Sequence, residues 1–408
     1  MNKNNLLVGQ SGGPTAVINS SLQGVVKAGL ESNEIGTVYG MVNGIEGFLK
    51  GNTINFTDDV SKEDIELLCT TPGAYLGSCR FKMPETLEDE IFPKAFAKFE
   101  EMGIGYVFYN GGNDSMDTVS KMSRYADKIG SDIKFIGVPK TVDNDLVMTD
   151  HTPGFASAAR YVATTVREIA IDASVYDSKS VTIVEIMGRH AGWLTAAAAL
   201  ARNEVGDNPL LVYLPEINFD CDKFLKDVEA ALVKNQNLVV CVSEGINDKE
   251  GTFICEYDSS AGVDSFGHKM LAGCGKYLEN LVRDKLGVKA RSVELNVSQR
   301  CSAIMQSKTD QQEAINCGRA AVAGALKGET GKMVAFDRTS GSDYSITYSF
   351  QDVNEICNKE KVVPNEWITN EGSDVSDEFI AYARPLIQGI VEVPLGEDGL
   401  PKYVRRTK

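Results

Sequence analysis

The chain has 408 residues, of which 43% are apolar and 24% charged, a composition typical of a globular protein with two sizeable cores. Its formal charge of −16 disfavours nucleic acid and anionic membranes as partners, and no run approaches the about 18 apolar residues that predict a membrane span. Nine cysteines without a C-x-x-C pair predict reduced thiols in a cytoplasmic protein, with neither a disulfide framework nor a zinc site.

Short apolar strands alternate with helical patterns along the chain. Strands are predicted to end in "VGQSGG", "FYNGGND", "IGVPKTVDND", "IVEIMGRH" and "VVCVSEG". This alternation predicts an α/β fold with mostly parallel sheets, whose ligands lie beyond the C-terminal strand ends. Two units are expected, with the active site in the cleft between them. The first covers 1–150 and is completed by about 300–345; the second covers 151–300 and is completed by about 346–408. "KMVAFDRTSGSDYSITYSF" predicts a hairpin that turns at Gly341.

The first candidate stretch is "QSGGPTAV", in which Gly12 and Gly13 follow a strand and Pro14 can open a helix. Backbone N–H groups exposed at such a helix start bind phosphate. A tight turn without a ligand explains the glycines equally well. Neither the nucleotide P-loop nor G-x-G-x-x-G matches this stretch.

The second stretch, "YNGGNDSMDT", places Asn113, Asp114 and Ser115 after another double glycine. A carboxylate beside a phosphate site needs a neutralising lysine or metal, and Mg²⁺ typically uses one or two carboxylates plus phosphate oxygens. The simpler interpretation is that Asp114 or Ser115 caps the following helix.

The third stretch, "GVPKTVDNDL", sets Lys140 beside Asp143 and Asp145. Lys140 can meet a phosphate, Asp143 can take a proton from an alcohol, and Asp145 can orient that alcohol or hold water on a metal. Phosphoryl transfer to a sugar hydroxyl requires such a combination. The alternative is an acidic surface loop, against which the strongly apolar preceding strand argues.

Two further regions follow along the chain. "EIMGRHAGW" places Met187, Gly188 and Arg189 at a strand end, where an arginine suits phosphate; the neighbouring His190 is interpreted as structural rather than as a base. Glu244 in "SEG" can bind sugar hydroxyls. Arg291 and Arg300 bracket "RSVELNVSQR" and can grip a sugar phosphate, although each taken alone suits a surface salt bridge.

Taken in order, these stretches resemble the phosphofructokinase family over roughly residues 5 to 325, and "LGSCRF" is similar to a further family segment that contains Arg80. The resemblance implies two Rossmann-like three-layer domains and phosphoryl transfer to the 1-hydroxyl of fructose 6-phosphate, giving fructose 1,6-bisphosphate. It makes Asp143 the general base, flanks the transferred group with Thr141 and Asp145, and uses Arg189 to stabilise the transition state. It assigns donor binding to Gly12, Gly13, Arg80, Asp114, Ser115 and Lys140. It assigns sugar-phosphate binding to Thr141, Asp143, Met187, Gly188, Arg189, Glu244, Arg291 and Arg300.

The resemblance also bears on the phosphoryl donor. ATP-using members usually carry glycine at the positions of Asp114 and Lys140, whereas members that use inorganic pyrophosphate carry side chains there. These side chains would obstruct a nucleoside beyond the second phosphate, and Lys140 adds charge for a short anion. Pyrophosphate is therefore the expected donor, in a reversible reaction that needs Mg²⁺. ATP as donor and sedoheptulose 7-phosphate as acceptor are the nearer alternatives; a sensor without catalysis is the distant one.

Some positions depart from the family pattern. Asn113 stands where the family has a metal-binding aspartate, so Asn113 and Asp114 are both candidates for the metal. Val297 replaces a histidine, and Ser180, with Lys179 beside it, replaces an arginine that the neighbouring subunit supplies in the family. Because the family's site borrows residues from a neighbour, a homodimer or homotetramer is expected.

Overall fold

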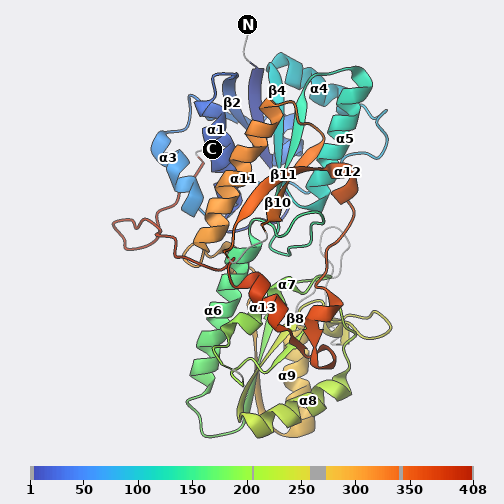
Figure 1. Ribbon diagram of the computed structural model, residues 1–408, viewed down its shortest axis with the longest axis vertical. Coiled ribbons are helices and arrows are strands. Elements are labelled where there is room, and N and C mark those ends of the chain that lie inside the picture. The colour runs from blue at the N-terminus through green and yellow to red at the C-terminus, as the bar shows by residue number, and fades with distance from the viewer. Residues whose placement is uncertain (1–3, 205, 258–272, 340–342, 407–408) are drawn as a thin grey trace.

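The computed structural model describes residues 4–204, 206–257, 273–339 and 343–406, which form two lobes stacked along the long axis (Figure 1). The upper lobe is built on a seven-stranded sheet and the lower lobe on a four-stranded sheet. Neither sheet closes into a barrel, and most neighbouring strands in both run parallel. The predicted α/β class with two mostly parallel sheets is confirmed.

The upper sheet has the strand order β11-β10-β5-β4-β1-β2-β3. Only the two edge strands, β3 and β11, run antiparallel to their neighbours. The strands are β1 (Asn4–Gln10), β2 (Ile35–Met41), β3 (Thr53–Asn55), β4 (Ile104–Gly111), β5 (Lys134–Pro139), β10 (Lys332–Arg338) and β11 (Ile346–Asp352). Its helices are α1 (Ile18–Glu31), α2 (Gly44–Leu49), α3 (Lys62–Leu67), α4 (Ile91–Glu101), α5 (Asn113–Ile129), α11 (Lys308–Leu326) and α12 (Val353–Ile356), with a 3₁₀ turn at Leu68–Thr70.

Both faces of this sheet are buried, because successive side chains of a strand point to opposite faces. Leu6 and Val8 belong to the core under α1 and α11, whereas Leu7 belongs to the core under α4 and α5. The helices α1 and α11 cross so closely that a Cβ at Gly24 would lie 2.1 Å from the Ile315 carbonyl oxygen. The glycine therefore permits this helix contact.

The lower sheet has the order β7-β8-β6-β9, with all neighbours parallel. Its strands are β6 (Ser180–Ile186), β7 (Leu211–Tyr213), β8 (Asn237–Ser243) and β9 (Lys289–Glu294). The helices are α6 (Phe155–Ala173), α7 (Trp193–Ala196), α8 (Cys221–Lys234), α9 (Cys274–Leu286), α10 (Ser298–Cys301) and α13 (Asp377–Ala383). Further 3₁₀ turns lie at Ala197–Ala201, Ile254–Tyr257, Asn365–Trp367 and Asn370–Gly372, and the small strands β12 (Ile368–Thr369) and β13 (Asp374–Val375) pair antiparallel.

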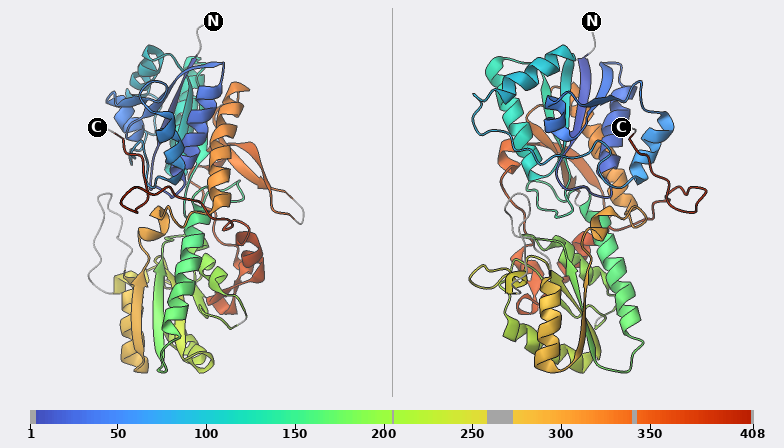
Figure 2. Two further views of the ribbon diagram at one scale, coloured as in Figure 1. Left: turned by 90° about the vertical axis from the view of Figure 1, so that its left-hand side faces the viewer. Right: turned by 180° about the vertical axis from the view of Figure 1, so that it is seen from behind.

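The expected division of the chain needs correction after residue 345. The predicted hairpin is present, with its turn at Gly341 outside the described residues, and β11 pairs with β10 along its whole length. Both strands of a hairpin must join one sheet, so β11 belongs to the upper lobe and not to the second unit. The C-terminal tail also returns there (Figure 2): Val404 packs in the upper core, and Arg406 donates from Nη1 to the Leu76 carbonyl oxygen at 2.9 Å.

Among the described residues, no helix combines the length and the apolar character that crossing a membrane requires. The two lobes are connected by the stretch from β5 to α6, by the chain around α10, by the segment after α12 and by the tail after α13. The first connection contains Lys140, Asp143 and Asp145 of the predicted site.

Candidate active site

Three parallel strands of the upper sheet end side by side. Gln10 of β1 is in register with Asn110 of β4, and Gly111 is in register with Pro139 of β5. The ladder continues past the strand ends, because the Lys140 N–H donates to the Gly111 carbonyl oxygen at 3.0 Å. Three stretches that are separated in the sequence therefore meet at one edge, as the parallel sheet predicts.

The Gly12–Gly13 turn packs directly against two cations. Lys140 donates from Nζ to the Gly13 carbonyl oxygen at 2.6 Å. A Cβ at Gly12, where φ is +76°, would lie 3.2 Å from Lys140 Nζ, and one at Gly13 would lie 3.3 Å from Arg300 Nη1. The buried Nε of Arg300 has no hydrogen-bond partner within the described parts of the chain. A turn without side chains, a buried ammonium group and an unsatisfied guanidinium N–H together favour an anion here.

Lys140 is a nearly dry cation, with 4% of its surface exposed. Burial has the largest effect and lowers its pKa to about 8, although the charges of Asp143 and Asp145 act in the opposite direction. Arg300 and Arg80 lower the pKa further, which places both arginines within electrostatic reach of Nζ. The segment before Arg80 lies on the glycine turn, because Ser78 donates from Oγ to the Gly12 carbonyl oxygen at 2.6 Å.

Asp143 and Asp145 form a pair of desolvated carboxylates. Burial, followed by the charge of Asp145, raises the pKa of Asp143 to about 6, against the opposing effects of Lys140 and Arg300. Burial also raises the pKa of Asp145, while a hydrogen bond with Thr141 lowers it. The Thr141 Oγ1 accepts from the Asp143 N–H at 3.0 Å. A carboxylate with a pKa near 6 is ionised at neutral pH yet accepts a proton more readily than an exposed aspartate.

Asn144, between the two acids, shapes this loop. Its φ of +54° lies in the left-handed region, which asparagine tolerates better than most residues. The buried amide donates from Nδ2 to the Tyr382 hydroxyl at 3.0 Å, and its Oδ1 accepts from the Thr152 N–H at 3.1 Å. The sequence interpretation gave Asn144 no role; an asparagine at a tight turn between two carboxylates was the available signal.

The lower lobe contributes the ends of β6 and β8. The Glu244 N–H donates to the Ile186 carbonyl oxygen at 2.8 Å, and Glu244 Oε1 accepts from the Gly188 N–H at 3.3 Å. A Cβ at Gly245 would lie 2.0 Å from the Arg189 carbonyl oxygen, so these two loops are in backbone contact.

The charged groups at this end of the lower sheet interact with Asp143, in the loop that follows β5. Burial raises the pKa of Glu244 to about 7; the charge of Asp143 raises it further, and that of Arg189 lowers it. The Met187 N–H donates to Gln299 Oε1 at 3.3 Å, which brings the neighbouring Arg300 to the same place. Lys140, Asp143 and Arg189 therefore share one electrostatic environment, as the predicted site requires.

The structure leaves Arg291 out of this convergence. Arg291 is in register with Thr182, early in β6, and lines a surface cavity with Glu168 and Asp172 of α6. Ser180 lies at the start of β6, where its Oγ accepts from Asn237 Nδ2 at 3.2 Å. Both positions lie near the start of the parallel strands, whereas Gly188 follows the C-terminal end of β6, because Ser180 is the first residue of β6 and Arg291 pairs with Thr182 two residues later.

The two metal candidates differ in what they contact. Asn113 donates from Nδ2 to the Lys359 carbonyl oxygen at 2.7 Å, and its Oδ1 accepts from the Asn358 N–H at 2.8 Å. Its amide is therefore occupied in anchoring the segment after α12. Asp114 is exposed in the first turn of α5, and Ser115 is buried against Ser11, with their Oγ atoms hydrogen-bonded. Among the described residues, no group of three or more His, Cys, Asp or Glu forms a preassembled metal centre.

Lys361 is a site neighbour that the sequence interpretation missed. Its N–H donates to the Asp145 carbonyl oxygen at 2.7 Å, and its Nζ donates to the Asp150 carbonyl oxygen at 2.8 Å. Burial lowers its pKa to about 8. No sequence pattern marks the segment around Lys361, which reaches the catalytic loop only because the chain crosses between the lobes there. The exposed His190 lies beside Phe253, with ring centroids 6.4 Å apart.

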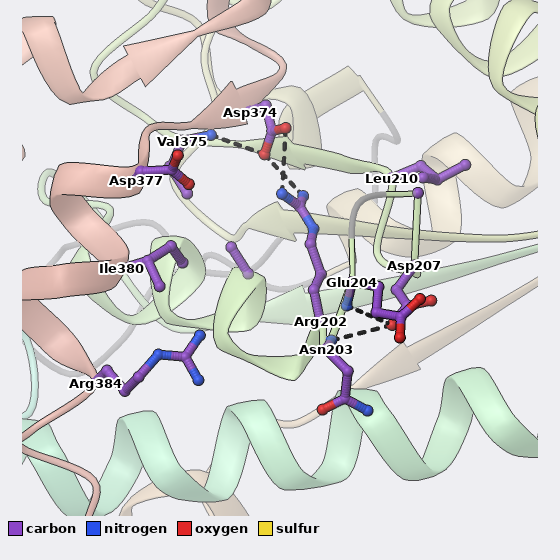
Figure 3. A pocket seen from close by; sticks show the side chains of 12 residues that line it. Arg202, Asn203, Glu204, Asp207, Leu210, Asp374, Val375, Asp377, Ile380 and Arg384 are labelled. Atoms are coloured by element: carbon purple, nitrogen blue, oxygen red, sulfur yellow. Dashed lines mark hydrogen bonds and ion pairs between the residues drawn. The ribbon is translucent and has the colours of Figure 1, made fainter.

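A cavity of about 460 Å³ in the lower lobe is separate from these residues (Figure 3). Figure 3 shows Arg202 hydrogen-bonded to Asp374, with an Nη2–Oδ1 distance of 2.7 Å, and Arg384, which directly follows α13, among the other lining residues. None of the residues predicted from the sequence lines it, so it is not the predicted active site.

Comparison with known proteins identifies the family. A model of the phosphofructokinase family matches residues 5–325. The chain belongs to the phosphofructokinase family. The resemblance inferred from the sequence motifs is thus confirmed, over the same span of residues.

Relatives and solved structures agree with this assignment. A phosphofructokinase of Halomonas elongata, named pyrophosphate–fructose 6-phosphate 1-phosphotransferase, is 39% identical over 413 residues, which cover 100% of this chain and 97% of the relative. A relative of the same name from Xanthomonas campestris pv. campestris is 40% identical over 99% of this chain and 96% of its own length. The crystal structure of a pyrophosphate-dependent phosphofructokinase from Nitrosospira multiformis superposes with a TM-score of 0.90 at 36% identity, covering 99% of this chain and 96% of that one.

Proposed function

We propose that this phosphofructokinase transfers a phosphoryl group from inorganic pyrophosphate to the 1-hydroxyl of fructose 6-phosphate, giving fructose 1,6-bisphosphate and phosphate. The carrying observation is the buried ammonium group of Lys140, which lies against the Gly12–Gly13 turn next to the loop of Asp143. The full-length relatives named for this reaction support the same assignment. An exchange of a phosphoanhydride for a sugar phosphate ester plus free phosphate proceeds in both directions at cellular concentrations.

The catalytic step uses one carboxylate, that of Asp143, and the two cations Lys140 and Arg189. Asp143 accepts the proton of the sugar 1-hydroxyl, while the oxygen of that hydroxyl forms a bond to the near phosphorus of pyrophosphate. The bond from that phosphorus to the bridging oxygen breaks, and free phosphate leaves beside Lys140. Arg189 lies within electrostatic reach of Glu244, as Asp143 does, and stabilises the charge that develops on the transferred group. Thr141 and Asp145 hold the base in place through the hydrogen bonds of the loop.

Sugar-phosphate binding falls to the ends of the lower strands. Arg300 has a buried Nε free to donate within the described residues, which suits the phosphate of the sugar. Glu244 has a pKa raised to about 7, so its carboxyl can accept from a sugar hydroxyl or donate to one. Met187 and Gly188 form the adjoining wall through their backbone contacts with Gln299 and Glu244.

The residues fit a Mg²⁺ ion that is completed by the substrate rather than held in a protein cage. Asp114 offers an exposed carboxylate in the first turn of α5, beside the Gly111–Gly112 strand end, and Asn113 is occupied elsewhere. Mg²⁺ commonly takes one or two carboxylates plus phosphate oxygens. Bound in this way, the ion would neutralise pyrophosphate and polarise its phosphorus–oxygen bonds.

A homodimer or homotetramer is part of the proposal. Arg291 and Ser180 face away from the site of their own chain, and the expected contribution of Arg291 to a sugar-phosphate site therefore requires a neighbouring subunit. A cytoplasmic location is supported by the nine cysteines, which form no disulfide within the described residues, as a reducing compartment would keep them.

Steady-state assays of the purified protein with fructose 6-phosphate, Mg²⁺ and either pyrophosphate or ATP test the proposal. The expected kcat/KM is at least about 100-fold higher with pyrophosphate, because a nucleoside meets the side chains of Asp114 and Lys140. The double variant Asp114→Gly/Lys140→Gly should lose at least about tenfold in kcat/KM for pyrophosphate.

A matched control is Lys50→Gly/Asp58→Gly, which removes one exposed acid and one exposed lysine elsewhere in the upper lobe and should leave kcat/KM unchanged. Faster turnover with ATP than with pyrophosphate would overturn the donor assignment. A higher kcat/KM for sedoheptulose 7-phosphate than for fructose 6-phosphate would overturn the acceptor.

A further inference from the structure

A second buried charge cluster lies directly behind the catalytic loop. Its centre is His151, with 0% of its surface exposed. The His151 Nδ1 lies 2.7 Å from Asp150 Oδ1, and its Nε2 lies 2.8 Å from Glu313 Oε2 on α11. Each ring nitrogen thus faces a carboxylate. A neutral imidazole donates from only one nitrogen, so only the doubly protonated, positively charged ring satisfies both contacts.

The carboxylates around His151 are themselves held in place. Arg338 of β10 donates to both oxygens of Asp150, from Nε at 3.0 Å and from Nη2 at 2.9 Å. Tyr344 donates from its hydroxyl to Glu313 Oε1 at 2.6 Å. The ring of Phe336 packs edge-on against the imidazole, with centroids 5.0 Å apart. Lys361 and Tyr382 complete the surroundings, and both of them contact the Asp150 carbonyl oxygen.

Hydrogen bonds connect the His151 cluster to the residues on either side of Asp143. Thr152, next to His151, donates from Oγ1 to the Thr141 carbonyl oxygen at 2.9 Å, and its N–H donates to Asn144 Oδ1 at 3.1 Å. Thr141 and Asn144 flank Asp143 on either side. Tyr382 closes the ring, because its hydroxyl accepts from Asn144 Nδ2 at 3.0 Å and donates to the Asp150 carbonyl oxygen at 2.8 Å.

We propose that His151 is a positioning residue for phosphoryl transfer: its imidazolium, clamped between Asp150 and Glu313, fixes the loop of residues 141–152 so that Asp143 meets the sugar hydroxyl. This inference rests on the proposed function of Asp143. His151 touches neither substrate; it acts through Thr152, Asn144 and Asp150. Loss of its charge would set one ring nitrogen against a carboxylate without a shared proton, and the loop would lose an anchor.

The protonation of His151 agrees with this role. Burial acts to lower its pKa, but the hydrogen bonds and charges of Asp150 and Glu313 outweigh burial and raise it above its usual value. Conversely, hydrogen bonds from His151 and Arg338 overcome burial and lower the pKa of Asp150 to about 2. The ring therefore keeps its charge to a higher pH than an ordinary imidazole does, and loses it as the pH rises through the raised value.

The variant His151→Gln tests the proposal in the intact protein with pyrophosphate and fructose 6-phosphate. We expect kcat to fall by about 10- to 100-fold, since small displacements of a base have effects of that size, while both KM values change by less than about threefold. Amide hydrogen exchange over residues 141–146 should become faster than in the wild type. That readout needs no activity, so it judges the inference even if the wild type proves inactive with these substrates, an outcome that would refute the proposed function alone.

A matched control is Lys121→Met in α5. Lys121 is also a buried cation held by two carboxylates, with its Nζ 2.7 Å from Asp117 Oδ2 and 2.9 Å from Glu85 Oε1. Within the described parts of the chain, its ammonium group makes no hydrogen bond to residues 141–152. Its variant should lower Tm and leave kcat unchanged. If His151→Gln lowers Tm as Lys121→Met does but keeps the wild-type kcat and the wild-type exchange at residues 141–146, the proposal is overturned.

Glu313→Gln provides an independent test should His151→Gln fail to fold. Removing one of the two carboxylates lowers the pKa of His151, so kcat should begin to fall at a lower pH than in the wild type as the solution is made alkaline. Near neutral pH its kcat should approach the wild-type value. A pH profile of kcat that runs parallel to the wild-type profile would show that the charge of His151 does not position the base, and would overturn the proposal.

Discussion

Two buried charge clusters lie within ten residues of each other in the sequence, and they respond to burial in opposite ways. In the cluster of Lys140, Asp143 and Asp145, the effect of burial exceeds that of the charged partners. It raises the pKa of Asp143 to about 6 and lowers that of Lys140 to about 8. In the His151 cluster, partners prevail: the pKa of Asp150 falls to about 2 and that of His151 rises. The charged groups of the first cluster are incompletely paired, whereas His151 and Asp150 of the second cluster each have two direct side-chain partners.

The difference has a physical cause in the number of direct partners. Asp150 receives hydrogen bonds from both His151 and Arg338, so its charged form is stabilised more than burial destabilises it. No direct ion pair between Lys140 and Asp143 is formed, and Lys140 donates instead to the carbonyl oxygen of Gly13. A binding site that must bind and release anions keeps its charges incompletely paired, while a cluster that positions a loop gains from complete pairing.

The largest expected effect concerns the base. Asp143→Asn should lower kcat by at least about 1,000-fold, because the amide cannot accept the hydroxyl proton although its shape is retained. Steady-state and single-turnover rates with pyrophosphate and fructose 6-phosphate measure this loss. A loss in kcat of tenfold or less would show that Asp143 is not the base. The two clusters would then not differ in function as proposed.

The second prediction compares stability in the two clusters. Asp150→Asn should lower the free energy of unfolding by about 3 kcal/mol, because it leaves His151 and Arg338 without their buried partner. Asp143→Asn should leave stability unchanged or raise it, because the folded state disfavours the charge of Asp143. Urea unfolding at pH 7 measures both variants. Equal losses would show that the two carboxylates do not differ as described.

Their pH dependence has opposite signs. The folded pKa of Asp150 is lowered, so its stabilising contribution is present above its unfolded pKa of about 3.9 and is lost as the pH falls toward about 2. The folded pKa of Asp143 is raised, so its ionisation costs stability as the pH rises from about 4 to about 6. The stability difference between Asp150→Asn and the wild type should accordingly shrink at the lowest pH.

The smallest expected effect is the pH profile of activity. Asp143 must be ionised and Lys140 protonated, so kcat/KM for pyrophosphate should fall below pH about 6 and above pH about 8, by up to tenfold per pH unit. The titration of pyrophosphate itself is measured in the same buffers and subtracted. In Lys140→Arg the alkaline fall should move to higher pH, because a guanidinium stays charged. An unmoved alkaline fall would assign it to another group.

Most of the catalytic side of the site followed from short segments of sequence. Apolar strands that end in "SGG", "GGND", "VPKTVDND" and "MGRH" predicted loops at the C-terminal strand ends of two parallel sheets. The first three loops meet at one edge of the upper sheet, and the fourth follows β6 of the lower sheet. Such inferences succeed because the rule that places ligands beyond the C-terminal strand ends depends on local pattern and on strand direction alone. The turn at Gly12 and Gly13, which lies next to Lys140 and Arg300, could likewise be predicted from the local sequence.

Other features depended on partners far away in the chain. Asn113 and Asp114 were both candidate metal ligands, and the amide of Asn113 contacts Asn358 and Lys359, which follow it by about 245 residues. The strand β11 was assigned to the wrong lobe, because the tail of the chain crosses between the lobes more than once. Lys361 gave no sequence signal at all, since its contacts with Asp145 and Asp150 arise only from that crossing.

The sequence by itself determined the α/β class, the family and the loops that contain Lys140, Asp143 and Arg189, because these depend on periodicity and on residues that are neighbours along the chain. Only the tertiary structure decided which buried ionisable side chains have direct partners of opposite charge and which do not. The pKa of Asp150 differs from that of Asp143 because His151 and Arg338 donate hydrogen bonds to the Asp150 carboxylate, and Arg338 joins the loop from the distant strand β10. Burial and pairing are properties of the folded core, and the pKa of each group follows from them.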